Sequence, residues 1–121
     1  MGQDRPRSNV AASALRAVEF HVLLSLSVDD RHGYGIIQDI QARGETSVPD
    51  LGTMYRALAR MVEAGLIESA ARRPAPDADD ERRNYYRITP KGREAARVEA
   101  RRLELLTRAA RARGLLTRSA R

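Results

Sequence analysis

Polar side chains that can bond to the edges of a nucleic-acid groove are concentrated between Asp50 and Gly65. Two guanidinium groups, a hydroxyl and a phenol occur there within about two helical turns, beside a glycine whose backbone can approach a groove closely. Such groups bond to base edges and to phosphates. We therefore expect contact with the major groove of double-stranded DNA, with the last of them contacting phosphate rather than bases. The expected contact residues are Gly52, Thr53, Tyr55, Arg56 and Arg60.

The same segment has the pattern of one amphipathic helix with both ends marked. Asp50 can cap the first turn by accepting a backbone N–H bond. Gly65 supplies a residue that adopts the left-handed conformation that ends helices. Apolar residues recur at spacings of three and four, so they form one stripe that turns the polar residues outward. The stripe consists of Leu51, Met54, Leu58, Met61 and Val62.

Two further helices are predicted before this one. Residues 1–12 form a basic, polar tail with no apolar period, which predicts disorder. A helical pattern begins at Ala14, and Phe20 and Leu24 make its apolar surface wider than one core contact requires. A break at residues 29–33 precedes a short helix over residues 33–42. The side chains that this short helix is expected to bury are Tyr34, Ile36, Ile37 and Ile40.

A β-hairpin is predicted after Gly65. Residues 66–70 and 84–89 have the composition of two strands, and the two prolines and four acidic residues between them exclude a strand interior. Acidic side chains repel phosphate, so we expect the tip to stay away from DNA. Arginines at the hairpin base are the expected contacts, although they also suffice to neutralise the neighbouring acids. These arginines are Arg72, Arg73, Arg82 and Arg83.

A long final helix begins at Thr89-Pro90, a strong start signal, and is predicted to reach Gly114. Its length means that it projects beyond a small domain. Its arginines alternate with glutamates at helical spacing, which indicates a solvated face with ion pairs. We expect its apolar side to pack against the first helix of a second copy across a two-fold axis. The residues of this predicted dimer interface are Phe20, Leu24, Leu103, Leu106 and Ala110.

These elements predict a mainly α fold with a small β-hairpin, a winged helix-turn-helix followed by a dimerisation helix. The predicted boundaries are a DNA-binding domain at residues 13–89 with its wing at about 66–89, a dimerisation helix at 90–114 and a disordered tail at 115–121.

Composition agrees with a nucleic-acid partner. The chain has 121 residues, a formal net charge of +6 and no cysteine, and its isoelectric point is about 10.7. A basic balance suits phosphate binding. All but one of the 22 basic residues are arginine, which fits either base recognition or GC-rich codon usage. The apolar runs are too short to span a bilayer, and the start lacks the apolar core of a signal peptide. We expect a cytoplasmic, nucleoid-associated protein.

No arrangement of residues typical of an enzyme, a metal site or a cofactor site occurs. Nucleophile–base pairs and phosphate-binding glycine loops are absent from the sequence, and a zinc site lacks sufficient ligands because the only histidines are His21 and His32. His32 can cap a helix, pack, or touch a phosphate, and Tyr34 can reach a phosphate with its hydroxyl. The main alternative function is a winged helix that binds another protein, because a fold does not fix a function. That version is expected to expose aromatic or aliphatic anchors on the helix at residues 50–65.

Several short motifs resemble the PadR-like family of bacterial transcriptional regulators. They are Val22-Leu23-x-x-Leu26, His32-Gly33-Tyr34-x-Ile36, Gly52-Thr53-Met54-Tyr55-Arg56-Ala57-Leu58, Glu63-Ala64-Gly65-Leu66-Ile67 and Tyr85-Tyr86-Arg87-Ile88-Thr89-x-x-Gly92. The resemblance covers about residues 22–92, and the short remainder resembles the subgroup with a single C-terminal helix. It implies a homodimeric repressor that binds an inverted-repeat operator. Some members bind flat aromatic effectors at the dimer interface through tryptophans, whereas this chain has no tryptophan.

Overall fold

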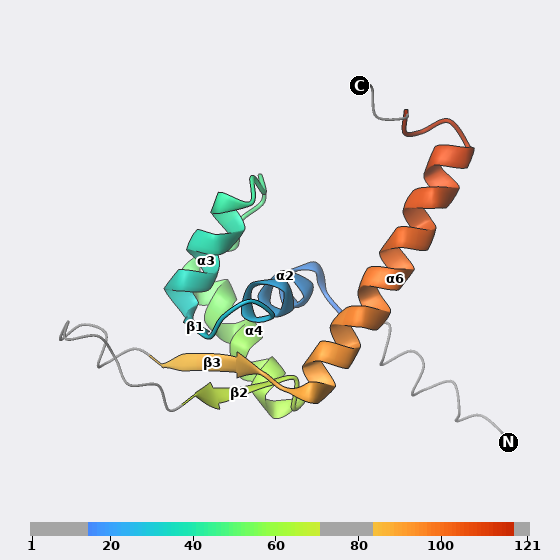
Figure 1. The fold of residues 1–121 in the computed structure, drawn as a ribbon. Coiled ribbons are helices and arrows are strands. Elements are labelled where there is room, and N and C mark those ends of the chain that lie inside the picture. Colours follow the sequence, from blue (N-terminus) through green and yellow to red (C-terminus); the bar gives the residue numbers. More distant parts are fainter. Residues whose placement is uncertain (1–14, 71–83, 118–121) are drawn as a thin grey trace, which may run out of the picture.

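The computed structural model describes residues 15–70 and 84–117. Within these ranges the chain forms four helices and a small antiparallel sheet (Figure 1). The elements in chain order are α2 (Ala17–Leu26), β1 (Arg31–His32), α3 (Gly33–Ala42), α4 (Leu51–Glu63), β2 (Ile67–Ala70), β3 (Tyr85–Ile88) and α6 (Pro90–Ala112). The predicted mainly helical fold with a small sheet is confirmed.

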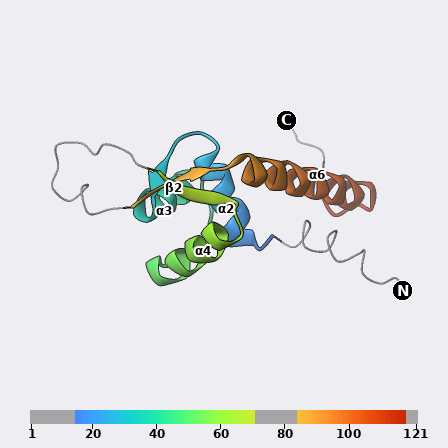
Figure 2. The ribbon, with the colours of Figure 1, turned by 90° about the horizontal axis from the view of Figure 1, so that it is seen from below.

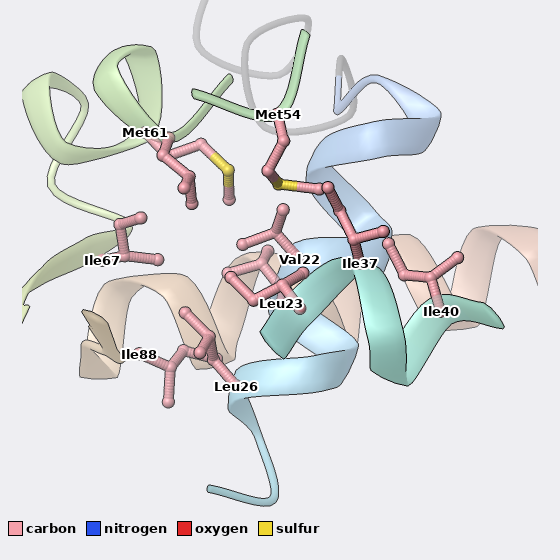
Figure 3. Packing of buried hydrophobic residues seen from close by; sticks show 11 residues of the cluster. Val22, Leu23, Leu26, Ile37, Ile40, Met54, Met61, Ile67 and Ile88 are labelled. Carbon is pink, nitrogen blue, oxygen red and sulfur yellow. The ribbon is translucent and has the colours of Figure 1, made fainter. Parts of the chain in front are cut away.

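The core lies where α2, α3 and α4 meet the sheet. Val22 and Leu23 occupy its middle, with Met54 and Met61 of α4 on one side (Figure 3). All eleven side chains of this cluster are at most 8% exposed. Burying one such aliphatic side chain contributes about 1.5–3 kcal/mol. The remaining members are Leu26, Ile36, Ile37, Ile40, Leu58, Ile67 and Ile88.

Side-chain hydrogen bonds cap the starts of three helices, and the predicted end of α4 is seen as well. Asp50 Oδ1 accepts from Thr53 N at 2.8 Å at the start of α4, and Gly65 after α4 has φ +80°. Thr89 Oγ1 accepts from Gly92 N at 3.0 Å at the start of α6. His32 caps α3, because its Nδ1 accepts from Gly35 N at 2.9 Å. Each cap satisfies a backbone donor that has no partner within the helix.

The sheet contains one strand that the sequence did not predict. The two residues of β1 were expected only to interrupt the helical pattern, but they pair with β3 in the register Arg31↔Tyr86 and His32↔Tyr85. The strand order is β1-β3-β2, so β3 is central. On its other side β3 pairs with β2 from Ile67↔Ile88 to Ala70↔Tyr85. The start of α3 is thereby fixed to the base of the wing.

A polar cluster holds α2, β1 and α3 together. Ser25, which is fully buried, donates from Oγ to Asp39 Oδ2 at 2.7 Å. Arg43 donates to Ser25 Oγ at 3.0 Å, and Arg31 Nη2 lies 3.6 Å from Asp39 Oδ1. Burial raises the pKa of Asp39, but the Ser25 hydrogen bond and the two arginines outweigh burial and bring the pKa below its ordinary value.

The long helix α6 begins beside the core and then leaves it. Ala95 and Ala96 pack against the core cluster, and both views show the later turns running away from α3 and α4 (Figures 1 and 2). The charged residues of α6 were expected to lie on a solvated face, but Glu99 is only 4% exposed. Arg102 compensates this burial by donating from Nε and Nη2 to the two carboxylate oxygens of Glu99.

Three apolar or aromatic predictions were wrong. Tyr34, expected in the core, is 48% exposed. Leu51 and Val62 of the predicted apolar stripe are also exposed, at 44% and 41%. The helix spacing places all three at the margin of a buried face, where the neighbouring elements decide burial.

Candidate nucleic-acid interface

The outer face of α4 carries the residues predicted to enter a groove. Met54, Ala57, Leu58 and Met61 point into the core, so the opposite face lies in solvent. Gly52, Tyr55 and Arg56 are exposed and Thr53 is partly exposed. The structure therefore brings four of the predicted contacts together over the first two turns of one helix.

Thr53 links the helix cap to Arg56. Its backbone N–H donates to Asp50, and this bond is the main reason that the pKa of Asp50 lies below its ordinary value. Its hydroxyl accepts from Arg56 Nη2 at 3.3 Å. A guanidinium group has five N–H donors. The bond to Thr53 uses one of them and orients the Arg56 side chain, and the other donors remain for a ligand. A Cβ added at Gly52 would lie 3.5 Å from Arg56 Nη1, an ordinary contact.

Tyr55 packs on the start of α3 rather than against the core. A Cβ added at Gly33 would lie 2.9 Å from Cε1 of the Tyr55 ring, so glycine is what allows this contact. The pKa of Tyr86 is raised by burial and, secondarily, by the Tyr55 phenol. The His32 and Tyr85 rings meet edge to face with centroids 5.1 Å apart. Aromatic groups from α4, β1 and β3 thus gather at the base of the wing.

Arg60 points toward α2. Its Nε lies 3.4 Å from Glu19 Oε2, and the Glu19 side chain is 12% exposed. Glu19 also accepts from the backbone N of Arg16 at 2.9 Å. The predicted phosphate contact by Arg60 therefore has to compete with a partly buried carboxylate, which distinguishes Arg60 from Arg56.

The described part of the wing carries ion pairs on its surface. Arg87 Nη1 lies 3.5 Å from Glu68 Oε2 across the strands, and Arg87 Nε lies 3.7 Å from Asp30 Oδ2. Such exposed pairs contribute about 0–1 kcal/mol. The four arginines predicted at the hairpin base, together with the acidic tip, lie outside the described residues. They are Arg72, Arg73, Arg82 and Arg83.

The end of α4 and the residues that follow it are joined to the start of α6 by two hydrogen bonds and by one close approach of the backbone at Gly92. Lys91 Nζ donates to the Ala64 carbonyl at 2.8 Å, and Thr89 Oγ1 donates to the Gly65 carbonyl at 2.7 Å. A Cβ added at Gly92 would overlap the carbonyl oxygen of Leu66. A cation at a helix C-terminus is also favoured by the helix dipole. The candidate groove-facing helix and the long helix therefore share one rigid joint.

The predicted dimer-interface residues are solvent-accessible in the single chain. Leu106 is 53% exposed, and Leu24 and Leu103 are exposed as well. Phe20 and Ala110 are partly exposed. Leu105, which the sequence analysis left out of the interface, is also exposed on α6.

Other kinds of site find little support in the part of the chain that the structure describes. In residues 15–70 and 84–117, no three His, Cys, Asp or Glu side chains are grouped so that they can hold a metal ion. None of the described helices is both long and apolar enough to cross a membrane. Glu45, Ser47 and Pro49 of the segment before α4 line a pocket together with Thr53. Their position could not be predicted, because a connecting segment has no periodicity that indicates it.

The fold and the exposed face of α4 define a winged helix-turn-helix protein. The sequence pattern of the transcriptional regulator PadR-like family matches residues 22–98, which is more than half of the chain. The chain belongs to this family of transcriptional regulators.

Solved structures agree with this assignment. A PadR family transcription regulator from Clostridium difficile has a TM-score of 0.68 and 24% identity over 80% of this chain and 97% of that chain. A transcriptional regulator from Clostridium thermocellum has a TM-score of 0.66 and 26% identity over 93% and 97%. Bacillus subtilis PadR, solved in complex with operator DNA, has a TM-score of 0.57 and 17% identity over 68% and 45%. No curated protein matches the chain.

Proposed function

We propose that this protein is a transcriptional repressor that binds double-stranded DNA as a homodimer on an inverted-repeat operator. The observation that carries the proposal is the exposed first half of α4, where Gly52, Thr53, Tyr55 and Arg56 share one face. Glycine permits close approach, the hydroxyl and phenol can bond to phosphates, and the Arg56 fork matches the edge of guanine. The formal net charge of +6 favours binding to phosphate.

Two copies are needed because each chain offers one such face. In a helix-turn-helix dimer the two reading helices lie about 34 Å apart, one helical turn of DNA. Packing Leu103 and Leu106 of one copy on Phe20 and Leu24 of the other removes exposed apolar surface on both helices. A two-fold axis makes each contact occur twice. Release from the operator by a flat aromatic effector in this seam is part of the proposal, and the absence of tryptophan means that other side chains bind it.

A protein-interaction role is the second candidate, and one observation favours it. Leu51 and Val62 are exposed on α4, although a helix that only reads DNA needs no apolar residues there. Aliphatic side chains of this kind are typical anchors for a protein partner. DNA binding is favoured over this candidate because Arg56 and Thr53 stand together at the helix start, the end of the helix that contacts bases in this fold.

One selection experiment distinguishes the two functions. The purified protein is incubated with random duplex DNA at moderate salt, and the retained fragments are sequenced. We expect an inverted repeat with its half-sites one turn apart, and a logarithm of affinity that falls linearly with the logarithm of salt concentration. Recovery of random sequences with the same affinity as the bulk would contradict the operator proposal and leave the protein-binding role.

A further inference from the structure

A pocket within a single chain lies beside the start of α4. Its volume is ≈ 350 Å³, which is within the range of small-molecule sites, about 300–1,000 Å³. The described walls come from α2, from the segment that joins α3 to α4, and from α4 itself. They include Val18, His21, Glu45, Ser47, Pro49 and Thr53.

The hydrogen bonds of His21 define which of its ring nitrogens carries a proton. Arg43 Nη1 lies 3.3 Å from His21 Nδ1. An arginine only donates, so Nδ1 accepts and the ring hydrogen of the neutral histidine is on Nε2. His21 Nε2 is 3.7 Å from Glu45 Oε1, too far for a hydrogen bond. The imidazole and the Glu45 carboxylate therefore lie side by side without a hydrogen bond between them.

Glu45 has acceptor capacity directed at the pocket. Its side chain is 40% exposed, and in the described part of the chain it accepts no hydrogen bond. An ionised carboxylate accepts at two oxygens, with about four lone-pair sites. Among the described lining residues there is no lysine or arginine. This is unusual for a chain with 22 basic residues, and it makes the pocket a poor site for anions.

We propose that this pocket binds a small organic cation with N–H donors, an amine or amidine on a compact apolar body. The charged group bonds to the Glu45 carboxylate, since charge-assisted hydrogen bonds are the strongest type available there. The apolar body packs on Val18 and Pro49, and the Ser47 hydroxyl provides a further acceptor. All of these groups belong to one chain, so the site does not require the second copy that the proposed effector seam needs.

A ligand in the pocket affects the exposed, DNA-facing side of α4 through Thr53. Thr53 lines the pocket, and its hydroxyl accepts from Arg56 Nη2. A ligand donor that bonds to this hydroxyl shares the acceptor with Arg56 and weakens the 3.3 Å bond that orients the guanidinium. This consequence rests on the proposed DNA-binding function, whereas binding of the cation itself does not.

The binding step is tested on the full chain by titration with benzylamine and with benzamidine, followed by ¹⁵N–¹H correlation spectra. Benzyl alcohol and benzoate serve as the neutral and anionic controls at constant ionic strength. We expect saturable shifts confined to the amides of residues around the pocket. Glu45→Gln is expected to weaken binding about tenfold, and Glu63→Gln, an exposed glutamate at the end of α4, is expected to leave binding unchanged.

A second variant tests the site by filling the pocket with a larger side chain. Ala17 is an exposed residue of α2 that lines the pocket, and Ala17→Phe fills part of the space. The same spectra show whether this variant is folded. Loss of the benzylamine shifts in folded Ala17→Phe supports the site. The proposal is overturned if neither cation gives localised saturable shifts, if benzoate binds at least as tightly, or if Glu45→Gln binds as the wild type does.

The coupling step is measured separately on the selected operator. Saturating benzylamine is expected to lower the operator affinity of the wild type several-fold and to leave that of Ala17→Phe unchanged. Equal effects on both proteins, or no effect on the wild type, would overturn the coupling. A failure of all DNA binding would instead overturn the proposed function, because the spectra without DNA report on the pocket alone.

Discussion

Gly92 lies so close to the carbonyl of Leu66 that a Cβ at this position has no room. The obstacle is backbone, which cannot rotate away as a long side chain does. The contact fixes α6 against the end of α4 and the start of β2, next to the hydrogen bond from Thr89 N to Leu66 O at 3.1 Å. Glycine at this position is therefore a steric requirement of the joint.

Gly92→Ala is expected to lower the free energy of unfolding by about 1–3 kcal/mol, the usual cost of overpacking. Gly52→Ala is the matched control, because its added Cβ meets only ordinary contacts. Alanine is favoured over glycine inside a helix by about 0.5–1 kcal/mol, so Gly52→Ala is expected to be neutral or slightly stabilising. Urea denaturation measures both. Equal stability of the two variants would contradict the tight contact at Gly92.

Gly52→Ala is expected to weaken operator binding although the protein stays folded, because the added methyl keeps the α4 backbone away from the groove. Fluorescence anisotropy with the selected operator measures this effect. Wild-type affinity in the folded variant would mean that the start of α4 does not approach the duplex closely.

Arg56→Ala is expected to cost about 1–3 kcal/mol on the selected operator and to relax preference at one base position. The reason is the loss of a guanidinium fork that Thr53 orients. Arg97→Ala is the control, since Arg97 is an exposed arginine paired with Glu94 on α6. Binding to a library of single-base variants measures the change. An unchanged base preference would remove Arg56 from the predicted base contacts.

Arg82→Ala and Arg83→Ala are expected to weaken binding to all sequences alike. Loss of a phosphate contact reduces the release of counterions, so the slope of log affinity against log salt becomes shallower by about one unit per contact. Affinities at several salt concentrations, on operator and random duplexes, test this. A change in base preference without a change in slope would show that the wing reads bases.

Leu106→Asp is expected to shift the protein toward monomer and to abolish tight operator binding. A leucine buried in a symmetric interface contributes about 1.5–3 kcal/mol at each of two positions. Val28→Asp is the control, because Val28 is 79% exposed and lies outside the predicted seam. Sedimentation velocity gives the mass of both variants. A dimer with normal DNA affinity for Leu106→Asp would refute this interface and the effector site within it.

Asp39→Asn is expected to lower the free energy of unfolding at pH 7 by about 1–3 kcal/mol, because the buried Ser25 and the two arginines lose their charged acceptor. The pKa of Asp39 in the folded protein lies below its ordinary value of 3.8. Its stabilising effect is therefore complete above pH 3.8 and is lost as pH falls through the lower folded pKa. Unfolding midpoints are measured between pH 7 and pH 2. Stability should fall less with pH in Asp39→Asn than in the wild type or in the exposed variant Glu94→Gln.

Features that depend on neighbouring residues in the sequence were predictable, and features that depend on packing between elements were not. The caps at Asp50 and Thr89 are local hydrogen bonds, so residue type and spacing were sufficient to locate them. The strand β1 has two residues and exists only because β3 pairs with it. Glu99 is buried within a run of alternating charges that, taken alone, indicates a solvated face. The roles of Thr53 and Arg56 in DNA contact stay predictions, since residue types show what a face can bind but not what it does bind.

The joint between α4 and α6 also has a consequence for labelling chemistry. Lys91 is the only lysine in the sequence, and its amine is held on the Ala64 carbonyl. Reagents that acylate amines therefore find a single side chain, besides the α-amino group. Acylation removes the charge and requires the neutral amine with its lone pair turned to the reagent, so the bond to the Ala64 carbonyl competes with the reaction. The rate at which this one residue is acylated thus reports how often its amine leaves the Ala64 carbonyl at the end of α4, with no probe introduced by mutation.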